Sequence, residues 1–108
     1  FLLWDELAFG AMLAALDSGL EIPRDISFAG YDDDQIACLT PVSLTTIHMP
    51  AEEIALEASS MLQMLLEGAP CKKLLRLPGK IVLRESAMPP AGVAPGASAA
   101  AKIAEANV

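Results

Sequence analysis

Hydrophobic residues recur on two faces of a segment near the start of the chain, and this pattern predicts a helix from Asp5 to Gly19. Asp5 and Glu6 place negative charge in the first turn, where the helix dipole favours it, and Gly19 is a natural helix end. One apolar stripe holds Ala8, Met12 and Ala15, and the other holds Phe9, Leu13, Leu16 and Leu20. A helix that is apolar on two faces must be covered on both. We therefore expect a sheet against one stripe, and more chain or a second subunit against the other.

The next segments predict strands separated by a short helical turn. Residues 26–31 form a short apolar run of the kind found in strands that are buried on both faces of a parallel sheet. Three carboxylates, Asp32 to Asp34, follow it. Residues 35–39 predict one or two helical turns that end before Pro41, and the β-branched residues in 43–47 predict another strand.

A second helix is predicted over residues 50–67, where the apolar positions have ordinary amphipathic spacing and Gly68 marks the end. Residues 73–77 and 80–85 then predict two strands with a turn between them. Strands that alternate with helices indicate an α/β fold with three layers and a mostly parallel sheet.

Composition adds that the core is aliphatic, because 54% of the residues are hydrophobic and only 5% are aromatic. Residues 87–108 are dominated by Pro, Gly and Ala, so this tail is expected to be disordered. No apolar run is long enough to span a bilayer, and no membrane partner is expected. The chain begins with Phe1 and without a signal-peptide pattern, and we interpret it as a part of a longer protein.

Charge and reactive side chains exclude several classes of function. The net charge is −7 and the seven Lys and Arg residues are scattered, so this chain alone is not expected to bind nucleic acid. Cys38 and Cys71 lack CxxC spacing and are interpreted as reduced thiols of a cytoplasmic protein. His48 is the single histidine, which leaves a zinc site without ligands. No catalytic triad or phosphate-binding glycine loop is present, so the sequence predicts no catalytic residue, no metal, no cofactor and no enzyme.

Six short motifs occur in order over residues 1 to about 86, and together they resemble the end of LacI/GalR-family bacterial transcriptional regulators. The motifs are Asp5 with Ala8 and Gly10, Gly19-Leu20, Pro23 with Asp25-Ile26-Ser27, Gly30-Tyr31-Asp32-Asp33, Leu44-Thr45-Thr46-Ile47 with Pro50, and Leu77-Pro78 with Ile81-Val82-Leu83-Arg84-Glu85-Ser86. Each motif alone is weak, whereas six at matching spacing are specific.

The resemblance implies a periplasmic-binding-protein-like fold, in which two α/β lobes enclose an effector. By this analogy residues 1–47 belong to the C-terminal lobe, residues 48–72 carry a helix of the N-terminal lobe, and residues 73–86 return to the C-terminal lobe. The chain then supplies only part of each lobe, and we expect that it does not fold stably by itself.

Two residues are candidates for effector binding. The resemblance places Asp32 at a position that contacts the effector, and a carboxylate at a strand end suits hydroxyl groups of a sugar or nucleoside. The alternative is that Asp32 caps the following short helix. Trp4 stands where the family usually has Asn, and it either stacks on a sugar face or fills space at the cleft edge. Asp33 and Asp34 are interpreted as helix-start and solvent-facing residues.

The resemblance also implies a homodimer. Phe9, Leu13 and Leu39 are the candidate interface residues, and the alternative is burial inside one subunit. The implied function is a regulator that senses a sugar-like or nucleoside-like effector and binds operator DNA through an N-terminal domain that this chain lacks. A sugar-binding protein of an ABC transporter is the alternative, and an enzyme on an α/β scaffold is a third hypothesis.

Overall fold

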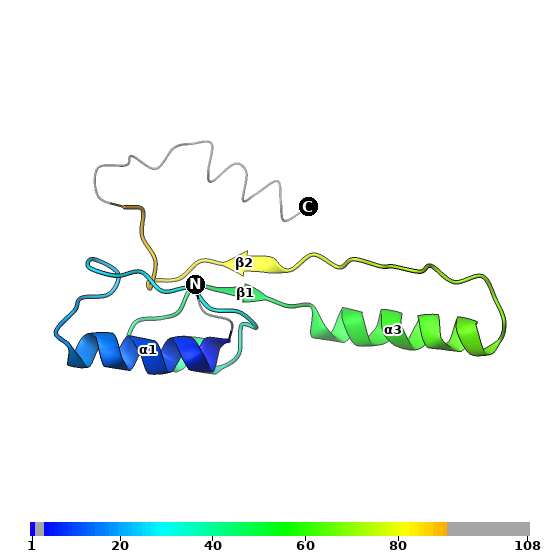
Figure 1. The fold of residues 1–108 in the computed structure, drawn as a ribbon, viewed down its shortest axis with the longest axis horizontal. Helices are drawn as coiled ribbons and strands as arrows, with labels where there is room; N and C mark the ends of the chain where they lie inside the picture. Colours follow the sequence, from blue (N-terminus) through cyan, green and yellow to red (C-terminus); the bar gives the residue numbers. More distant parts are fainter. Residues whose placement is uncertain (2–3, 91–108) are drawn as a thin grey trace.

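The computed structural model describes residue 1 and residues 4–90 (Figure 1). Its elements in chain order are α1 (Asp5–Asp17), α2 (Ile36–Leu39), β1 (Thr46–His48), α3 (Ala51–Leu66) and β2 (Lys80–Val82). Both long helices are confirmed close to their predicted bounds. Most of the predicted disordered tail, from residue 91 on, lies outside the described residues. No helix in the described part of the chain is long and apolar enough to cross a membrane.

Helix α1 ends where its sequence predicts. Gly19 has a φ of 79°, a left-handed conformation that glycine adopts without strain. This turn lets the N–H of Gly19 donate to the carbonyl of Leu16 at 2.9 Å and the N–H of Leu20 donate to that of Ala15 at 3.0 Å. These bonds satisfy carbonyls that the helix itself leaves free.

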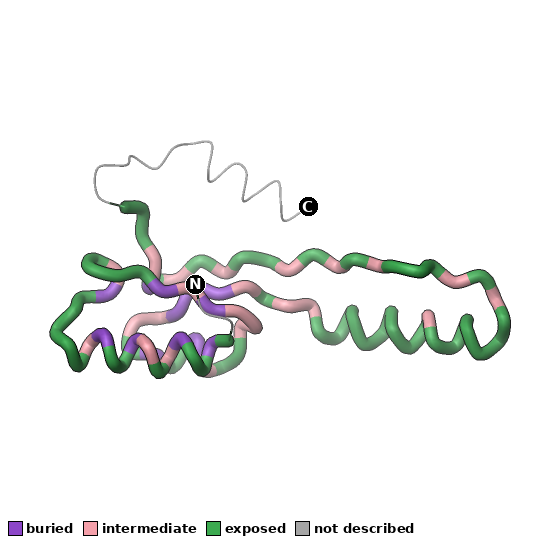
Figure 2. The backbone as a smooth tube through the Cα atoms, in the orientation of Figure 1, coloured by how far each residue is buried: buried purple, intermediate pink, exposed green. Residues whose placement is uncertain are grey.

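Within the described residues, one of the two apolar stripes of α1 is fully covered. Ala8, Met12 and Ala15 are buried, and they pack with a core formed by Ile22, Phe28, Ala37 and Leu44. The other stripe is covered only in part: Leu16 packs against the edge of the core, whereas Leu13 and Leu20 are each 40% exposed. Figure 2 shows that buried positions gather around α1 and the strands beside it. The expectation that the second stripe needs a further cover therefore still stands.

The expected mostly parallel sheet is not present in the described residues. The one ladder there is antiparallel: β1 pairs with β2, and Ile47 lies opposite Ile81. Residues 26–31 do not form a strand, although they run parallel to β1 through bridges at Ala29–Thr45 and Asp32–His48. A strand inside a parallel sheet has hydrogen-bonded neighbours on both sides, whereas within the described residues the backbone of residues 26–31 bonds only at Phe28, to Ser86, and at Gly30, to Thr45.

The strand predicted over residues 73–77 is wrong. This segment is extended but has no strand partner among residues 1 and 4–90, and it runs back along α3 toward β2 (Figure 1). Alternating hydrophobic residues favour a strand, but a strand also requires a second backbone for its hydrogen bonds. The strand predicted over 80–85 is correspondingly shorter and covers Lys80–Val82.

The described chain forms two halves joined by the β1–β2 pair (Figure 1). One half contains α1, α2 and the buried core, and the other contains α3 and the return segment, which we define as residues 70–79. Helix α3 has no buried residue, in contrast to α1 (Figure 2).

Candidate functional site

Asp32 lies directly after the segment that runs parallel to β1, and its backbone is held in an unusual conformation. Its φ is 108° and that of Asp33 is 58°, so two consecutive non-glycine residues have positive φ. Such conformations cost on the order of 1 kcal/mol or more per residue and persist only when the surroundings hold them. The N–H of Asp32 donates to the carbonyl of Ile47 at 2.9 Å, which ties this residue to β1.

Asp33 is not the helix-start residue that we expected. One carboxylate oxygen accepts a hydrogen bond from Nη2 of Arg84 at 2.6 Å, and the other lies 3.2 Å from Nδ1 of His48. The side chains of Asp33 and Arg84 are each only 18% exposed, so this ion pair is shielded from water. Asp34 is exposed as expected, and its carboxylate accepts the N–H of Gln35 at 2.6 Å just before α2.

Asp5 is a buried member of the site that its sequence position did not reveal. It is the first residue of α1 and makes no capping bond to that helix. Instead its fully buried carboxylate accepts the hydroxyl of Thr46 at 2.7 Å and the N–H of Asp34 at 3.0 Å. A methyl group at Gly30 would collide with this carboxylate, so the close approach requires glycine there.

Arg84 and Ser86 join the segment after β2 to the residues that lead into β1. Nη1 of Arg84 donates to the carbonyl of Leu44 at 2.9 Å while Nη2 binds Asp33. The buried hydroxyl of Ser86 accepts the N–H of Thr45 at 2.8 Å and donates to the carbonyl of Phe28 at 2.7 Å. Side chains two positions apart share a face of an extended chain, so the R-x-S motif has a structural reason.

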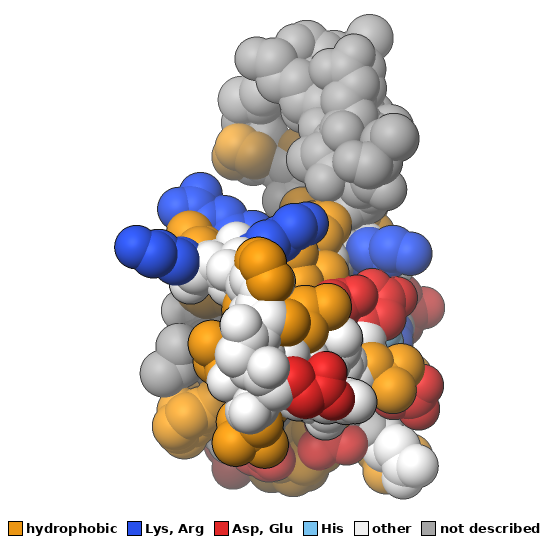
Figure 3. Space-filling model, turned by 90° about the vertical axis from the view of Figure 1, so that its right-hand side faces the viewer, with side chains coloured by type: hydrophobic (Ala, Val, Ile, Leu, Met, Phe, Trp, Pro, Cys, Tyr) orange, Lys and Arg blue, Asp and Glu red, His pale blue; other side chains and the backbone are white. Residues whose placement is uncertain are grey.

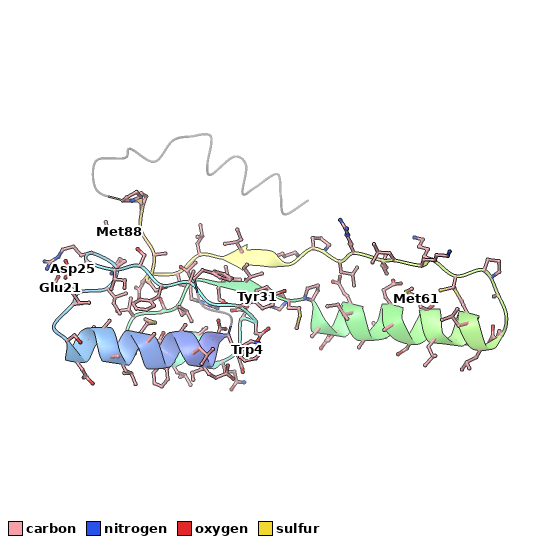
Figure 4. The ribbon with its side chains drawn as sticks, viewed as in Figure 1. Trp4, Glu21, Asp25, Tyr31, Met61 and Met88 are labelled. Carbon is pink, nitrogen blue, oxygen red and sulfur yellow. The ribbon has the colours of Figure 1, made fainter. Side chains whose placement is uncertain are left out.

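Trp4 is 52% exposed and forms the N-cap of α1, so it is not packed into the core. Figure 4 shows Trp4 and Tyr31 at the end of the α1 half that is nearer to α3, whereas Glu21 and Asp25 lie at the far end. The acidic loop, which we define as residues 31–34, therefore lies toward the junction between the halves.

Among the candidate interface residues, Phe9 is half-buried, Leu13 is 40% exposed and Leu39 is 76% exposed. Phe9 and Leu13 are one helical turn apart on α1, and α1 packs against α2, which carries Leu39. Burial inside the same subunit does not account for Leu13 and Leu39 within the described residues.

A hollow of considerable size lies elsewhere, between α3 and the return segment. It has a volume of about 880 Å³ and is lined mainly by apolar side chains, including Ile54, Met61, Leu75 and Leu77. Figure 4 shows Met61 on the side of α3 that faces the return segment. Figure 3 views this end of the molecule, where hydrophobic side chains are exposed between basic and acidic ones.

Neither this hollow nor a smaller one of about 520 Å³ beside Asp25 and Met88 includes Asp32 or Trp4. Within residues 1 and 4–90, no three His, Cys, Asp or Glu side chains gather closely enough to hold a metal ion. The acidic loop is thus a set of hydrogen-bonding groups on a surface.

Comparison with known proteins covers nearly the whole described chain. Residues 1–87 match the family model of the periplasmic binding protein-like domain. The arabinose metabolism transcriptional repressor of Geobacillus stearothermophilus is 38% identical over 80 residues, which is 74% of this chain and 21% of that repressor. The chain therefore spans about a fifth of the length of this relative.

Two solved structures show the same fold. The Lac repressor dimer bound to operator and the anti-inducer ONPF superposes with a TM-score of 0.76 at 32% identity, over 82% of this chain and 31% of that one. A LacI family transcriptional regulator from Lactobacillus casei with bound sucrose gives a TM-score of 0.65 at 30% identity, over 78% of this chain and 31% of that one.

Proposed function

Because the chain belongs to the LacI/GalR family of transcriptional regulators, which share a periplasmic-binding-protein-like core, we propose that it forms part of the effector-binding and dimerisation region of such a regulator. The effector is a small sugar-like ligand, with a nucleoside-like ligand as the second chemical class. In the intact protein, operator DNA is bound by a domain outside this chain. A cytoplasmic location and the absence of enzymatic activity belong to the same proposal.

The lobe assignment is also part of the proposal. Residues 1–47 and 73–86 contribute to one lobe, residues 48–72 contribute to the other, and the sheet of each lobe is completed by further chain. The division of the described chain into two halves joined by β1 and β2 supports this assignment.

The main observation in support of an effector site at Asp32 is that its carboxylate is available for hydrogen bonds. In the described part of the chain this carboxylate has no hydrogen-bond partner, whereas those of Asp5, Asp33 and Asp34 each accept at least one bond. An ionised carboxylate only accepts hydrogen bonds, so Asp32 is available to the hydroxyl groups of a sugar. Trp4 lies at the same end of the α1 half as Tyr31, which precedes Asp32 (Figure 4), and because it is 52% exposed its ring is available for stacking on a sugar.

The same contacts argue against the alternative role of Asp32 as a helix cap. The N-cap of α2 is Gln35, which has no side-chain capping bond, and the carboxylate bound to the N–H of Gln35 belongs to Asp34. The sugar-binding protein of a transporter is the less supported function, because the named relatives are regulators.

Asp32→Ala tests the site in the intact protein. A ligand that binds only the native state raises the free energy of unfolding, by about 2.7 kcal/mol when its concentration is a hundred times Kd. The melting temperature rises with it. We expect L-arabinose, sucrose or adenosine to raise the melting temperature of the wild-type protein, and Asp32→Ala to abolish that rise in a thermal-shift assay.

Asp17→Ala is the matched control, because it removes an exposed carboxylate at the far end of α1, away from the acidic loop (Figure 1). It is expected to keep the ligand-induced rise. An Asp32→Ala protein that responds to ligand as the wild type does would remove Asp32 from the site, and a wild type that responds to no sugar or nucleoside would contradict the proposed effector class.

A further inference from the structure

We infer that Asp5 and Arg84 are positioning residues for the effector site: they hold the acidic loop from two sides and thereby fix the direction of the Asp32 carboxylate. This inference rests on the proposed contact between Asp32 and the effector. Neither Asp5 nor Arg84 needs to touch the ligand, because both act through the two residues that follow Asp32 in the chain, Arg84 through Asp33 and Asp5 through Asp34.

The loop requires such a hold because its backbone is strained. Asp32 and Asp33 both have positive φ, a region that side chains with a Cβ atom rarely occupy. Without outside contacts the loop would relax toward ordinary conformations, and the Asp32 carboxylate would then sample many directions. A ligand would have to order the loop on binding, which lowers its affinity.

The first hold comes from the start of α1. The buried carboxylate of Asp5 accepts the N–H of Asp34 at 3.0 Å and the hydroxyl of Thr46 at 2.7 Å, so it joins the end of the loop to β1. Hydrogen bonds to an ionised group are stronger than neutral ones. Because Asp5 lies at a helix start inside the core, it offers the loop a rigid anchor.

The second hold comes from the segment after β2. Arg84 uses its two terminal nitrogens at once, one on the carbonyl of Leu44 and the other on the carboxylate of Asp33. The planar guanidinium fixes the angle between these two contacts, which a single ammonium group cannot do. Asp32 is therefore followed directly by a residue tied to Arg84, and then by a residue whose N–H is bound to Asp5.

His48 also contacts Asp33, the residue that Arg84 holds. Its Nδ1 lies 3.2 Å from the second carboxylate oxygen of Asp33, and its side chain is 50% exposed. Solvent screens this contact more than the one to Arg84, so Arg84 provides the stronger hold.

The experiment uses the intact protein and two readouts, one of which needs no ligand. Hydrogen exchange of the peptide that covers residues 30–35 reports whether the N–H groups of Asp32 and Asp34 are protected. The Kd for L-arabinose, or for sucrose if only sucrose binds, reports the site itself. The variants are Arg84→Gln, Asp33→Asn and both together, with Arg84→Lys as the conservative replacement.

We expect Arg84→Gln and Asp33→Asn each to speed exchange of this peptide by about tenfold and to raise Kd by about tenfold, the effect of losing one charge-assisted hydrogen bond. The double variant should be no worse than either single one, because all three lose the same ion pair. Arg84→Lys should recover part of both effects. Arg76→Gln is the matched control, since Arg76 is an exposed arginine on the return segment.

Exchange that is unchanged in both Arg84→Gln and Asp33→Asn would overturn the inference, whatever the ligand does. Faster exchange in the loop, together with ligand affinity that Asp32→Ala does not alter, would instead contradict the proposed effector contact. Asp33→Asn is nearly isosteric and covers the case in which Arg84→Gln fails to fold. Asp5→Asn, which keeps one acceptor for the N–H of Asp34, tests the first hold in the same way and should give a smaller effect.

Discussion

At the residue scale, Ser86 shows how one small side chain can join three segments. Its hydroxyl bonds to Thr45 and Phe28, and its backbone N–H donates to the carbonyl of Ser43 at 2.9 Å. The backbone of Phe28 returns a bond to the carbonyl of Ser86 at 2.8 Å. Residues 28, 43–45 and 86 are therefore tied together at a fully buried point.

Ser86→Ala should lower the free energy of unfolding of the intact protein by about 1–3 kcal/mol, because it leaves the N–H of Thr45 buried without an acceptor. Urea denaturation followed by circular dichroism measures this loss. Ser60→Ala on the exposed surface of α3 is the control, with an expected change within about 0.5 kcal/mol. A loss of equal size in the two variants would show that the Ser86 hydroxyl is not a special contact.

Asp25 gives a structural reason for the P-x-D-I-S motif. Its carboxylate accepts the N–H of Glu21 at 2.8 Å, and its own N–H donates to the carbonyl of Glu21 at the same distance. The bond from Glu21, with help from the guanidinium of Arg24, holds the pKa of Asp25 below its usual range. The residue closes the turn between α1 and the segment that leads to the acidic loop.

At the element scale, the ends of α1 and α3 follow from glycines in left-handed conformations, Gly19 and Gly68. Gly19→Ala is expected to lower the free energy of unfolding by about 1 kcal/mol, since alanine is strained at positive φ. Gly10→Ala, in the middle of α1 with open space around it, is expected to raise it by about 0.5–1 kcal/mol. Thermal unfolding of the two variants compares the signs, and equal signs would contradict the role given to Gly19.

Local pattern was enough to predict the helices, their ends and the two apolar stripes of α1, because each depends on residues within a few turns of one another. The motifs were enough to predict the family. The strand over residues 73–77 failed because strand formation depends on a partner that the local pattern does not contain. The parallel sheet stays a prediction, because the described residues contain only parallel bridges at Ala29–Thr45 and Asp32–His48 and a sheet needs further strands beside them.

The hydrogen bonds of the site could not be predicted from spacing. Asp33 and Arg84 are 51 positions apart, and Asp5 and Thr46 are 41 positions apart. These pairs meet because β1 lies between the loop and the segment after β2, which is a property of the topology. The R-x-S spacing of Arg84 and Ser86 was the one signal available, and the motif analysis used it for the family resemblance without assigning either residue a partner.

At the scale of the whole molecule, the two halves differ in how well their hydrophobic residues are buried. The α1 half has a buried core, whereas α3 exposes large hydrophobic residues on more than one face, among them Leu56, Leu62 and Leu66. Most helical stability in proteins comes from packing, so α3 requires further chain to cover it. This fits a chain that spans about a fifth of the length of a curated relative.

The exposed apolar residues on the α1 half need another explanation than those on α3, because the α1 half already has a buried core. Leu13 and Leu39 remain exposed there beside the half-buried Phe9, and we propose that a second copy of the protein covers them. Burial of apolar surface contributes about 25 cal/mol per Å², so a negative charge at the centre of such a contact should be strongly unfavourable.

Leu13→Glu and Leu39→Glu are therefore expected to convert the intact protein from dimer to monomer at micromolar concentration, as measured by sedimentation equilibrium. Gln63→Glu on α3 introduces the same charge at an exposed polar position and should leave the dimer intact. Melting temperatures separate dissociation from unfolding, because a monomer that keeps its core still melts cooperatively. Dimers that persist in both leucine variants would place the subunit contact on another surface and return Leu13 and Leu39 to burial by further chain of the same subunit.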